Sequence, residues 1–583
     1  MNRFTPQYLA KLSQLKEDEK SELVAVLEAL RGRKCLVVER SLRGLFGQLL
    51  GDAAPRFYSE HGVFFQRELG SPGAGGERFS SSGHDLPDHI VYIIRPTLEE
   101  SRQTSREIAD AVNKRGVRSQ FHVFFVPSRS VVCEQIFEDE GCTACTTFGE
   151  LGIGMLPLDT DLLTMEMPCV FKQCYLDGDT SSLGSVARAL LKLQRSFGVF
   201  PRVSSKGAAA KKVLQLLLHY RREEETLAGS AHALPDIDTM VLLDRDVDLF
   251  SAMVSPLTYE GLIDEVVGIH NGKIRVDASV LGDEKDELKL PQNIAGASAG
   301  AAPAKDTAPA HLPGEKVDIC LDSSDATYAD IRDLSIEQLG AYLQDRALQI
   351  KTSYSNFREK KDASIVEIHD FVKKIPKLTS EYKYLTQHIN IAQLIRQVTD
   401  GTDFRELWQM ERGMMEGETF YDQIEDAICA DADSQLCRVL RLMALQSITG
   451  NGIRAGRYDQ LRRLVIMTYG FQHTFTLNNL EKIGLLKKKD MVLVETASSL
   501  PWNVLRKNMR LINESVNMVN PTDMAYVSAG SAWYAPLSAR LIQNLAKPGG
   551  WAAMAETHRL LPGPVVDITQ TAEAEELART IHR

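Results

Sequence analysis

Short apolar runs alternate with amphipathic segments along the first third of the chain. The expected elements are strands at 35–38, 90–94 and 122–126 and helices at 98–112 and 130–137. Buried strands that alternate with helices are typical of a parallel sheet covered on both of its faces. The pattern therefore predicts a doubly wound α/β domain, which we place at residues 1–135.

The rest of the chain changes from mixed to helical character and back again. The elements expected before the change are a strand at 155–158, a helix at 185–197 and a strand at 240–243. The apolar spacing is then almost wholly helical from 328 to 483, and a strand at 524–527 and a helix at 537–545 follow. This order predicts a second doubly wound α/β domain that is interrupted by a mainly helical domain.

Domain boundaries follow from these changes of pattern. We place the second α/β domain at 136–250 and 480–583, and the helical domain at 251–479. Residues 295–314 within the helical domain are rich in Ala, Gly and Pro, a composition that buries too little apolar surface to fold. We expect that insert to be disordered, and the fold class to be α/β with a large helical insertion.

Composition and charge exclude several classes of protein. With 44% apolar and 25% charged residues the chain is an ordinary globular protein, and a net charge of -11 argues against general nucleic-acid binding. No apolar run approaches the ~20 residues that cross a bilayer. Nine cysteines are too few and too scattered for a disulfide framework, and the Cys142–Cys145 pair lacks a second ligand pair for zinc. We expect no cofactor and no metal.

A cluster of charges follows the strand expected at 240–243. Asp244 and Asp246 have the spacing of a phosphatase nucleophile and acid, but Asp248 breaks the position that should follow. The alternative is that Arg245 neutralises these carboxylates where the strand leaves its sheet. The usual hydrolase motifs are absent from the sequence, so we expect no enzymatic activity. We interpret Asp244, Arg245 and Asp248 as a structural junction and keep a phosphatase or phosphotransferase that uses Asp244 and Asp246 as the alternative.

A second candidate is a helical hairpin with a basic character. Ile350, Tyr354 and Phe357 fall at helical spacing, and a second apolar stripe starts at Ile365 after a polar turn. Residues 345–383 contain nine Lys or Arg and six Asp or Glu, in a chain that is acidic as a whole. Such a hairpin can hold a partner helix in a groove, although packing on the protein's own core is the alternative.

An ordered set of short motifs runs along nearly the whole chain. They lie at 125–130, 133–135, 156–166, 174–179, 243–245, 257–264, 440–447, 476–486, 520–523 and 534–540. In this order they resemble the Sec/Munc family of SNARE-binding proteins. The similarity is greatest to its vacuolar-sorting branch, the subunit thirty-three type of the HOPS and CORVET tethering complexes.

The resemblance implies a fold, a function and a site. The fold is a three-domain arch, and the function is a SNARE chaperone that promotes SNARE assembly and membrane fusion in endosome-to-lysosome or vacuole transport. The hairpin at about 342–375 is similar to the family's SNARE-binding hairpin. The residues expected to contact SNARE helices are Lys351, Tyr354, Phe357, Arg358, Lys360 and Lys361.

The resemblance also implies partners and a location. Arg462, Tyr469, Phe471 and His473 are similar to a surface that docks the helical-solenoid subunit of the class C tether, the vacuolar sorting protein sixteen type. Other tether subunits, no nucleic acid, and only indirect contact with membranes are expected. The protein would then be cytoplasmic and associate peripherally with late endosomes and lysosomes or vacuoles. A pure tether scaffold that binds no SNARE is a further alternative.

One departure from relatives concerns the C-terminus. Relatives carry an additional apolar strand and helix beyond the position of Gly563, whereas this chain stops at Arg583. We therefore expect a C-terminally shortened second domain, with an unpaired sheet edge unless another segment covers it.

Overall fold

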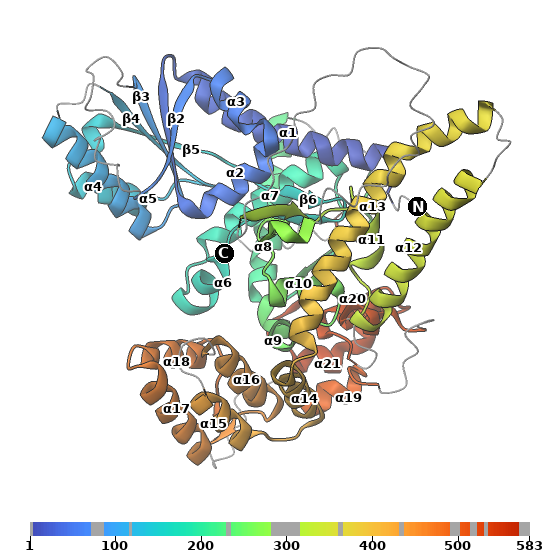
Figure 1. Cartoon of the computed structure of the whole chain (residues 1–583). Coiled ribbons are helices and arrows are strands. Elements are labelled where there is room, and N and C mark those ends of the chain that lie inside the picture. The colour runs from blue at the N-terminus through green and yellow to red at the C-terminus, as the bar shows by residue number, and fades with distance from the viewer. Residues whose placement is uncertain are drawn as a thin grey trace. The chain divides into compact units, whose positions relative to one another are not determined.

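The computed structural model of the chain describes residues 4–70, 87–115, 119–228, 235–281, 315–359, 365–430, 436–489, 502–513, 522–529 and 534–570. It divides into two compact units. Unit 1 comprises Met1–Asp244 and Pro564–Arg583, and unit 2 comprises Arg245–Gly563. The chain therefore leaves unit 1 after Asp244 and returns at Pro564, so that unit 2 is an insertion (Figure 1).

A five-stranded parallel sheet forms the first part of unit 1. Its strands in spatial order are β2 (Val63–Glu68), β1 (Lys34–Val38), β3 (His89–Ile94), β4 (Gln120–Phe125) and β5 (Thr146–Glu150). The three expected strands of this region are confirmed as β1, β3 and β4. The expectation missed β2 and β5, the two edge strands, because edge strands are partly exposed and lack the continuous apolar runs that mark central strands.

Helices cover both faces of this sheet. The helices of the region are α1 (Pro6–Ala29), α2 (Arg43–Leu50), α3 (Ala54–Glu60), α4 (Leu98–Arg115) and α5 (Val131–Asp139). Leu36 and Val38 of β1 pack in one core with α1, α2 and α3, whereas Cys35 and Val37 pack in a second core with α4 and α5. Successive strand residues thus point to opposite faces, as in any doubly wound sheet.

The second sheet of unit 1 is small and mixed. β8 (Arg202–Lys206) pairs in parallel with β9 (Thr239–Leu243) and antiparallel with β14 (Val565–Thr569). Helices α7 (Ser181–Phe197) and α8 (Ala208–Ala228) contribute to the cores beside it. The strand expected at 155–158 exists as β6 (Leu156–Asp159), but it pairs with β7 (Leu162–Thr164) in a separate antiparallel ribbon.

A strand does follow Gly563, since β14 covers the outer edge of β8. The sheet edge that we expected to be unpaired at this place is therefore paired. The strand escaped prediction because its burial alternates and its apolar run is short.

Helix α1 connects the two parts of unit 1. Its first half places Leu12 and Leu15 in the core that contains β8 and α7, and its second half places Leu23 and Leu27 in the core of the first sheet. One amphipathic helix thus contributes to two cores.

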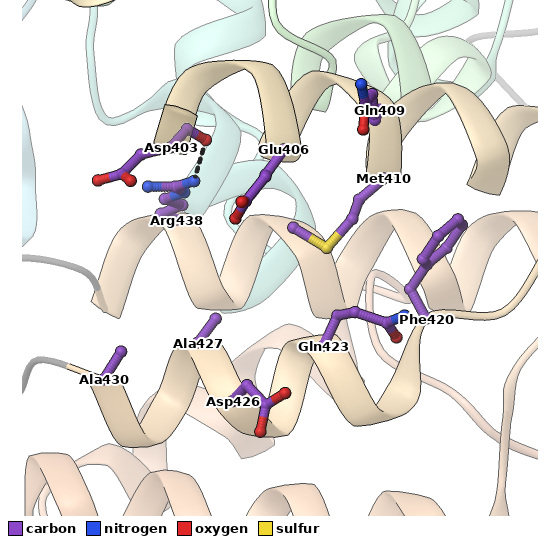
Figure 2. Close-up of a pocket in the computed structure, with 10 residues that line it drawn as sticks. All are labelled: Asp403, Glu406, Gln409, Met410, Phe420, Gln423, Asp426, Ala427, Ala430 and Arg438. Atoms are coloured by element: carbon purple, nitrogen blue, oxygen red, sulfur yellow. Dashed lines mark hydrogen bonds between the residues drawn. The ribbon is translucent and has the colours of Figure 1, made fainter. Parts of the chain in front are cut away.

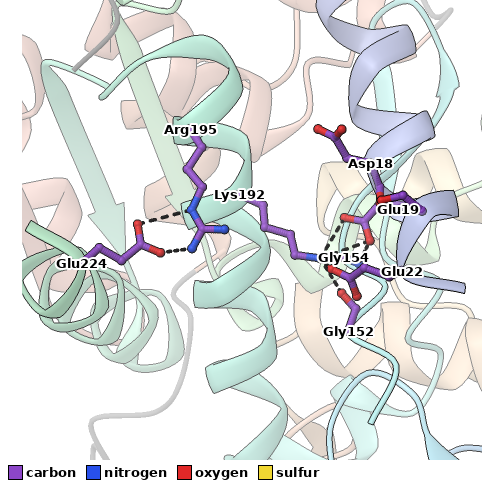
Figure 3. A network of polar contacts seen from close by, with 9 residues as sticks. Asp18, Glu19, Glu22, Gly152, Gly154, Lys192, Arg195 and Glu224 are labelled. Atoms are coloured by element: carbon purple, nitrogen blue, oxygen red, sulfur yellow. Dashed lines mark hydrogen bonds and ion pairs between the residues drawn. The ribbon is translucent and has the colours of Figure 1, made fainter. Parts of the chain in front are cut away.

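A buried polar network fixes α1 halfway along its length (Figure 3). The carboxylate of Glu19 is 1% exposed and accepts hydrogen bonds from the Gly154 N–H at 2.9 Å and the Lys192 Nζ at 3.2 Å. Lys192 also donates to Glu22 and to the Gly152 carbonyl, at 2.5 and 2.6 Å. Burial raises the pKa of Glu19, and the Lys192 ammonium partly offsets this shift. A buried charge with this many partners is satisfied, so we interpret the network as structural.

Unit 2 is mainly helical, as expected. Its first core contains α10 (Tyr259–Val266), the ribbon of β10 (Lys273–Asp277) and β11 (Lys316–Cys320), α11 (Ala326–Ile331), α12 (Ile336–Glu359) and α13 (Ile365–Thr399). The helices that follow are α14 (Thr402–Glu416), α15 (Tyr421–Ala430), α16 (Leu436–Thr449), α17 (Ala455–Tyr469) and α18 (His473–Lys482). The last helices are α19 (Trp502–Asn508), α20 (Leu537–Leu545) and α21 (Ala555–Leu560).

The strand expected at 524–527 is wrong, because this segment forms a 3-10 helix, Met524–Ala529. Asp523 accepts a hydrogen bond from the Ala525 N–H, which favours a turn over an extended chain. The insert expected to be disordered, 295–314, lies outside the described residues. The division into three domains stays a prediction, since the two units separate at Asp244 and Gly563.

Candidate functional site

The first candidate, Asp244, lies directly after β9 and caps a helix. Its two carboxylate oxygens accept hydrogen bonds from the Ala209 and Ala210 N–H groups at 2.8 and 2.6 Å, at the N-terminus of α8. A carboxylate is the preferred partner of these free N–H groups and of the helix dipole. Burial raises the pKa of Asp244, and the backbone hydrogen bonds partly offset the shift.

The geometry around Asp244 leaves little room for a substrate. Gly207 adopts φ +121°, and a Cβ at this position would lie 2.1 Å from the Asp244 carboxyl carbon. A helix N-terminus at the end of a strand is a common phosphate site, but here a carboxylate of the chain itself occupies it. The arrangement does not support the phosphatase alternative, because the Asp244 carboxylate itself takes the place at the helix N-terminus where a phosphate would bind.

Asp248 and Arg245 belong to unit 2 and differ from each other. Asp248 caps α9 (Leu249–Met253) by accepting from the Ser251 N–H at 3.1 Å, and it also accepts from the Ser538 N–H at 2.8 Å. Arg245 is exposed, and within the described part of the chain it forms no ion pair with these aspartates. Our expectation that Arg245 neutralises them is wrong, because backbone N–H groups satisfy Asp244 and Asp248 instead.

The other place where α/β proteins bind ligands is the switch point of the first sheet, between β1 and β3. Glu39 follows β1 and Arg95 follows β3, and both are 7% exposed. The Glu39 carboxylate accepts from the Arg95 backbone N–H at 2.6 Å and from the Ser41 hydroxyl. The Arg95 guanidinium donates to Ser41 and to the Glu166 carbonyl. The chain's own side chains therefore fill this crevice.

The expected hairpin is present as α12 and α13, which lie side by side in Figure 1. Arg346 of α12 and Glu381 of α13 form an ion pair of 3.4 Å between the helices. Ile350, the first member of the predicted apolar stripe, is 5% exposed and packs in the core of unit 2. The core therefore holds the base of the hairpin.

Several side chains of the described part of the hairpin are exposed. Lys351 was predicted as a contact residue, and it is exposed on α12 together with Leu348, which is 53% exposed. On α13, Lys373 is exposed and Tyr384 is 38% exposed. Tyr354, Phe357 and Arg358 lie on α12 with side chains outside the described set, and Lys360 and Lys361 lie outside the described residues.

The second predicted surface lies where α17 and α18 meet. Arg462 of α17 donates to Glu481 at 2.6 Å and to Asn478 at 2.7 Å, both on α18. Tyr469 ends α17 and is half-buried, and His473 begins α18 and bonds to Thr476 at 3.3 Å. Arg462 therefore connects the two helices, and the sequence analysis had not foreseen this structural role.

Three apolar side chains are exposed around the α17–α18 turn, those of Met467, Phe471 and Phe475, and we call this set the apolar patch. These side chains are 74%, 75% and 67% exposed. Phe471 was expected at this surface, whereas Met467 and Phe475 were not. The available signal was that Met467, Phe471 and Phe475 follow one another at intervals of four residues. The buried Leu477 does not belong to this series. Exposed apolar clusters of this kind mark interaction sites.

A cavity of about 440 Å³ lies between α14, α15 and α16 (Figure 2). Its described lining includes the carboxylates of Asp403, Glu406 and Asp426, the apolar Met410 and Phe420, and Arg438, which donates to the Asp403 carbonyl at 2.7 Å. The described lining residues contain no nucleophile beside a base, which hydrolytic catalysis requires.

The described residues contain neither a metal-binding cluster nor a helix that could span a membrane. They contain no group of three or more His, Cys, Asp or Glu side chains suited to hold a metal ion. In the same part of the chain, every helix is too short or too polar to cross a bilayer.

Comparisons with known proteins place the chain in a family. A model of the Sec1 family matches residues 34–579. The chain is 35% identical to vacuolar protein sorting-associated protein 33A of Rattus norvegicus, over 95% of this chain and 86% of that protein. It is 33% identical to the vacuolar protein-sorting-associated protein 33 homolog of Arabidopsis thaliana, over 95% and 84%.

Among solved structures, the fold is similar to the SM protein Vps45 in complex with the Qa SNARE Tlg2. The TM-score is 0.50 at 12% identity, over 96% of this chain and 88% of that one. This likeness concerns the fold. Together with the match along residues 34–579, it confirms the resemblance that the ordered motifs indicated: the chain belongs to the Sec1 family.

Proposed function

We propose that this protein is a SNARE-binding subunit of a HOPS- or CORVET-type tether, without enzymatic activity. It would promote SNARE assembly and fusion in transport from endosomes to lysosomes or vacuoles. Two relatives carry vacuolar protein sorting names, and the similar Vps45 was solved with a Qa SNARE. The observation that carries the proposal is the hairpin of α12 and α13, with its base in the core and basic and apolar side chains exposed beyond it.

The proposed SNARE surface combines two kinds of side chain. Leu348 and Tyr384 offer apolar area for a helix to bury, and Lys351 and Lys373 offer positive charge. Positive charge raises the rate of encounter with an acidic helix, and apolar burial provides affinity. We include Tyr354, Phe357, Arg358, Lys360 and Lys361 in this surface on the strength of the family resemblance.

The proposed docking surface for the helical-solenoid subunit is the turn between α17 and α18. Phe471 and Phe475 would be its anchors, because exposed aromatic side chains dominate the energetics of protein interfaces. Met467 adds adaptable apolar contact. We assign Tyr469 and His473 to its edge and Arg462 to its support.

Location follows from these partners. We propose that the protein is cytoplasmic and reaches late endosomal and lysosomal or vacuolar membranes through the tether and the SNAREs. It would contact other tether subunits, and neither nucleic acid nor lipid directly.

Binding to a preassembled endolysosomal SNARE bundle tests the proposal. We expect the purified chain to bind the bundle and its affinity to fall as salt rises, because charges contribute to the encounter. A properly folded chain that fails to bind would refute the SNARE role. If that chain still binds the solenoid subunit, the alternative of a tether scaffold that binds no SNARE is correct. Metal-dependent phosphate release that is lost in Asp244→Asn would instead favour the phosphatase.

A further inference from the structure

A cluster of three polar side chains lies inside the apolar core of unit 2. Tyr259, Asp325 and His388 are 0%, 7% and 2% exposed. The Nε2 atom of His388 lies 2.7 Å from the Asp325 Oδ2, and its Nδ1 atom lies 3.0 Å from the Tyr259 hydroxyl. Apolar residues of the same core include Leu385 and Ile391. Both ring nitrogens of a buried histidine are therefore bonded to defined partners.

The Tyr259 hydroxyl lies near two acceptors of His388, the ring Nδ1 atom at 3.0 Å and the backbone carbonyl oxygen at 3.4 Å. The neutral ring fits the cluster as one tautomer. Asp325 accepts at Oδ2, so the Nε2 of His388 carries the proton and Nδ1 accepts from the Tyr259 hydroxyl. Burial raises the pKa of Tyr259 well above its ordinary value, which keeps the hydroxyl protonated as a donor. The second oxygen of Asp325 accepts from the Thr327 N–H at 2.7 Å. No member of the cluster needs water.

The cluster joins three helices at defined points. Tyr259 is the first residue of α10, Asp325 is the N-cap of α11, and His388 lies on α13. Apolar contacts have no direction, so a helix displaced by one turn, about 5.4 Å, can meet similar apolar neighbours. Hydrogen bonds to a buried polar group restrict both rotation and sliding, and this is the best-attested use of such groups.

We propose that His388 is a positioning residue for the SNARE surface, because it fixes the register of α13 against α10 and α11. Residues 365–383 form the arm of the hairpin and belong to the same continuous helix as His388. A displacement at His388 therefore reaches the arm through this helix, which contains Pro376 and can bend there. The inference rests on the proposed function, since it assigns His388 to the placement of that surface.

Three variants of the full chain test the proposal. Tyr259→Phe removes the hydroxyl with its bonds to His388 and keeps the aromatic ring, whereas His388→Leu removes the bonds of the imidazole to both Tyr259 and Asp325. Leu385→Ala is the matched control, because Leu385 is 2% exposed on the same helix and contributes packing without a side-chain hydrogen bond. Hydrogen exchange of residues 365–383 and titration with the SNARE bundle are the measurements, and binding of the solenoid subunit reports an intact fold at α17 and α18.

We expect Tyr259→Phe to speed exchange in the arm and to weaken SNARE binding about fivefold, and His388→Leu to have a larger effect. Leu385→Ala should leave SNARE affinity unchanged when it and the wild type are each measured the same number of degrees below their own melting temperatures. If His388→Leu does not fold, Tyr259→Phe decides. Equal losses of SNARE affinity in Tyr259→Phe and Leu385→Ala would overturn the positioning role of His388.

The two proposals fail in different ways. If the wild-type chain binds no SNARE bundle, the proposed function is wrong. In that case hydrogen exchange still tests whether His388 fixes the register of α13. Unchanged exchange of residues 365–383 in Tyr259→Phe overturns the inference. Faster exchange there supports the effect on the register of α13, without a link to SNARE binding.

Discussion

The two units differ in how they use the places where ligands or partners commonly bind. In unit 1, the ends of the strands are filled by the chain's own groups, with Asp244 on the N-terminus of α8 and Glu39 beside Arg95 at the switch point. In unit 2, helix faces stay open, with Lys351 on the hairpin and Phe471 at the α17–α18 turn. The difference teaches that internal contacts can fill the ligand crevice of an α/β fold, while an inserted domain keeps exposed helix faces, which we propose as the binding surfaces.

The strongest test of this comparison is the apolar patch of unit 2. The double variant Phe471→Asp and Phe475→Asp should weaken binding of the solenoid subunit about a hundredfold or more, since each anchor contributes ~2 kcal/mol. Stability should not change, because these side chains are 75% and 67% exposed.

Isothermal titration measures the affinity. Met524→Asp is the matched control, at an apolar residue of unit 2 that is 65% exposed, and an equal loss there would remove the patch's special role.

Charge reversal on the hairpin should have the next largest effect. With Lys351→Glu and Lys373→Glu, we expect SNARE affinity to fall about tenfold at low salt and to become less sensitive to salt. Binding of the solenoid subunit should stay the same. Titration at two salt concentrations measures both effects. Lys507→Glu, at an exposed position of α19, is the control, and a similar loss there would indicate general electrostatics.

In unit 1, loss of the Asp244 cap should affect stability and not binding. Asp244→Ala should lower the free energy of unfolding by about 1–2 kcal/mol, whereas Asp244→Asn should cost less because Asn also caps helices. Urea unfolding measures the difference. Both variants should bind the SNARE bundle and the solenoid subunit as the wild type does at temperatures where they are folded. A selective loss of binding would contradict the division between the units.

The smallest effect concerns the ion pair between Arg202 of β8 and Asp567 of β14, 2.6 Å long. Arg202 holds the pKa of Asp567 below its ordinary value. The contribution to stability is therefore present above the ordinary carboxyl pKa and is lost as pH falls through the lowered one. Both side chains are more than a third exposed, so Asp567→Asn should cost less than about 1 kcal/mol near neutral pH.

Urea unfolding at several pH values checks this, and the difference from wild type should shrink in acid. Asp139→Asn is the control, at an exposed acid that lacks an ion pair within the described residues. A pH-independent cost of Asp567→Asn would show that the pair contributes packing alone.

Most of the fold could be predicted from apolar periodicity. The strands β1, β3, β4 and β9 contain short apolar runs, and a helix such as α20 has a regular apolar stripe. The edge strands were missed because their conformation depends on pairing with one neighbouring strand. The strand expected at 524–527 was wrong because one side chain, Asp523, favours the 3-10 helix Met524–Ala529. Such nonlocal or single-residue causes leave little signal in a sequence window.

Less of the candidate site could be predicted. The hairpin was predicted from its two apolar stripes, and its role and the surface near Tyr469 came from the family resemblance. The exposure of Met467 and Phe475 required the structure. Periodicity shows which residues share a helical face, but not whether that face meets a core or solvent. Arg245 shows the same limit for charges, since its neighbours are satisfied by backbone groups that a sequence does not reveal.

The pairing of β14 with β8 has a consequence for biosynthesis. Ser204 of β8 and Asp567 of β14 are hydrogen-bonded although 363 residues separate them along the chain. During synthesis, all of unit 2 is translated before β14, so one edge of β8 lacks its partner strand for that whole time. Open strand edges promote aggregation, and contacts between distant segments form slowly. Nascent chains of this protein should therefore depend on chaperones until β14 has been translated.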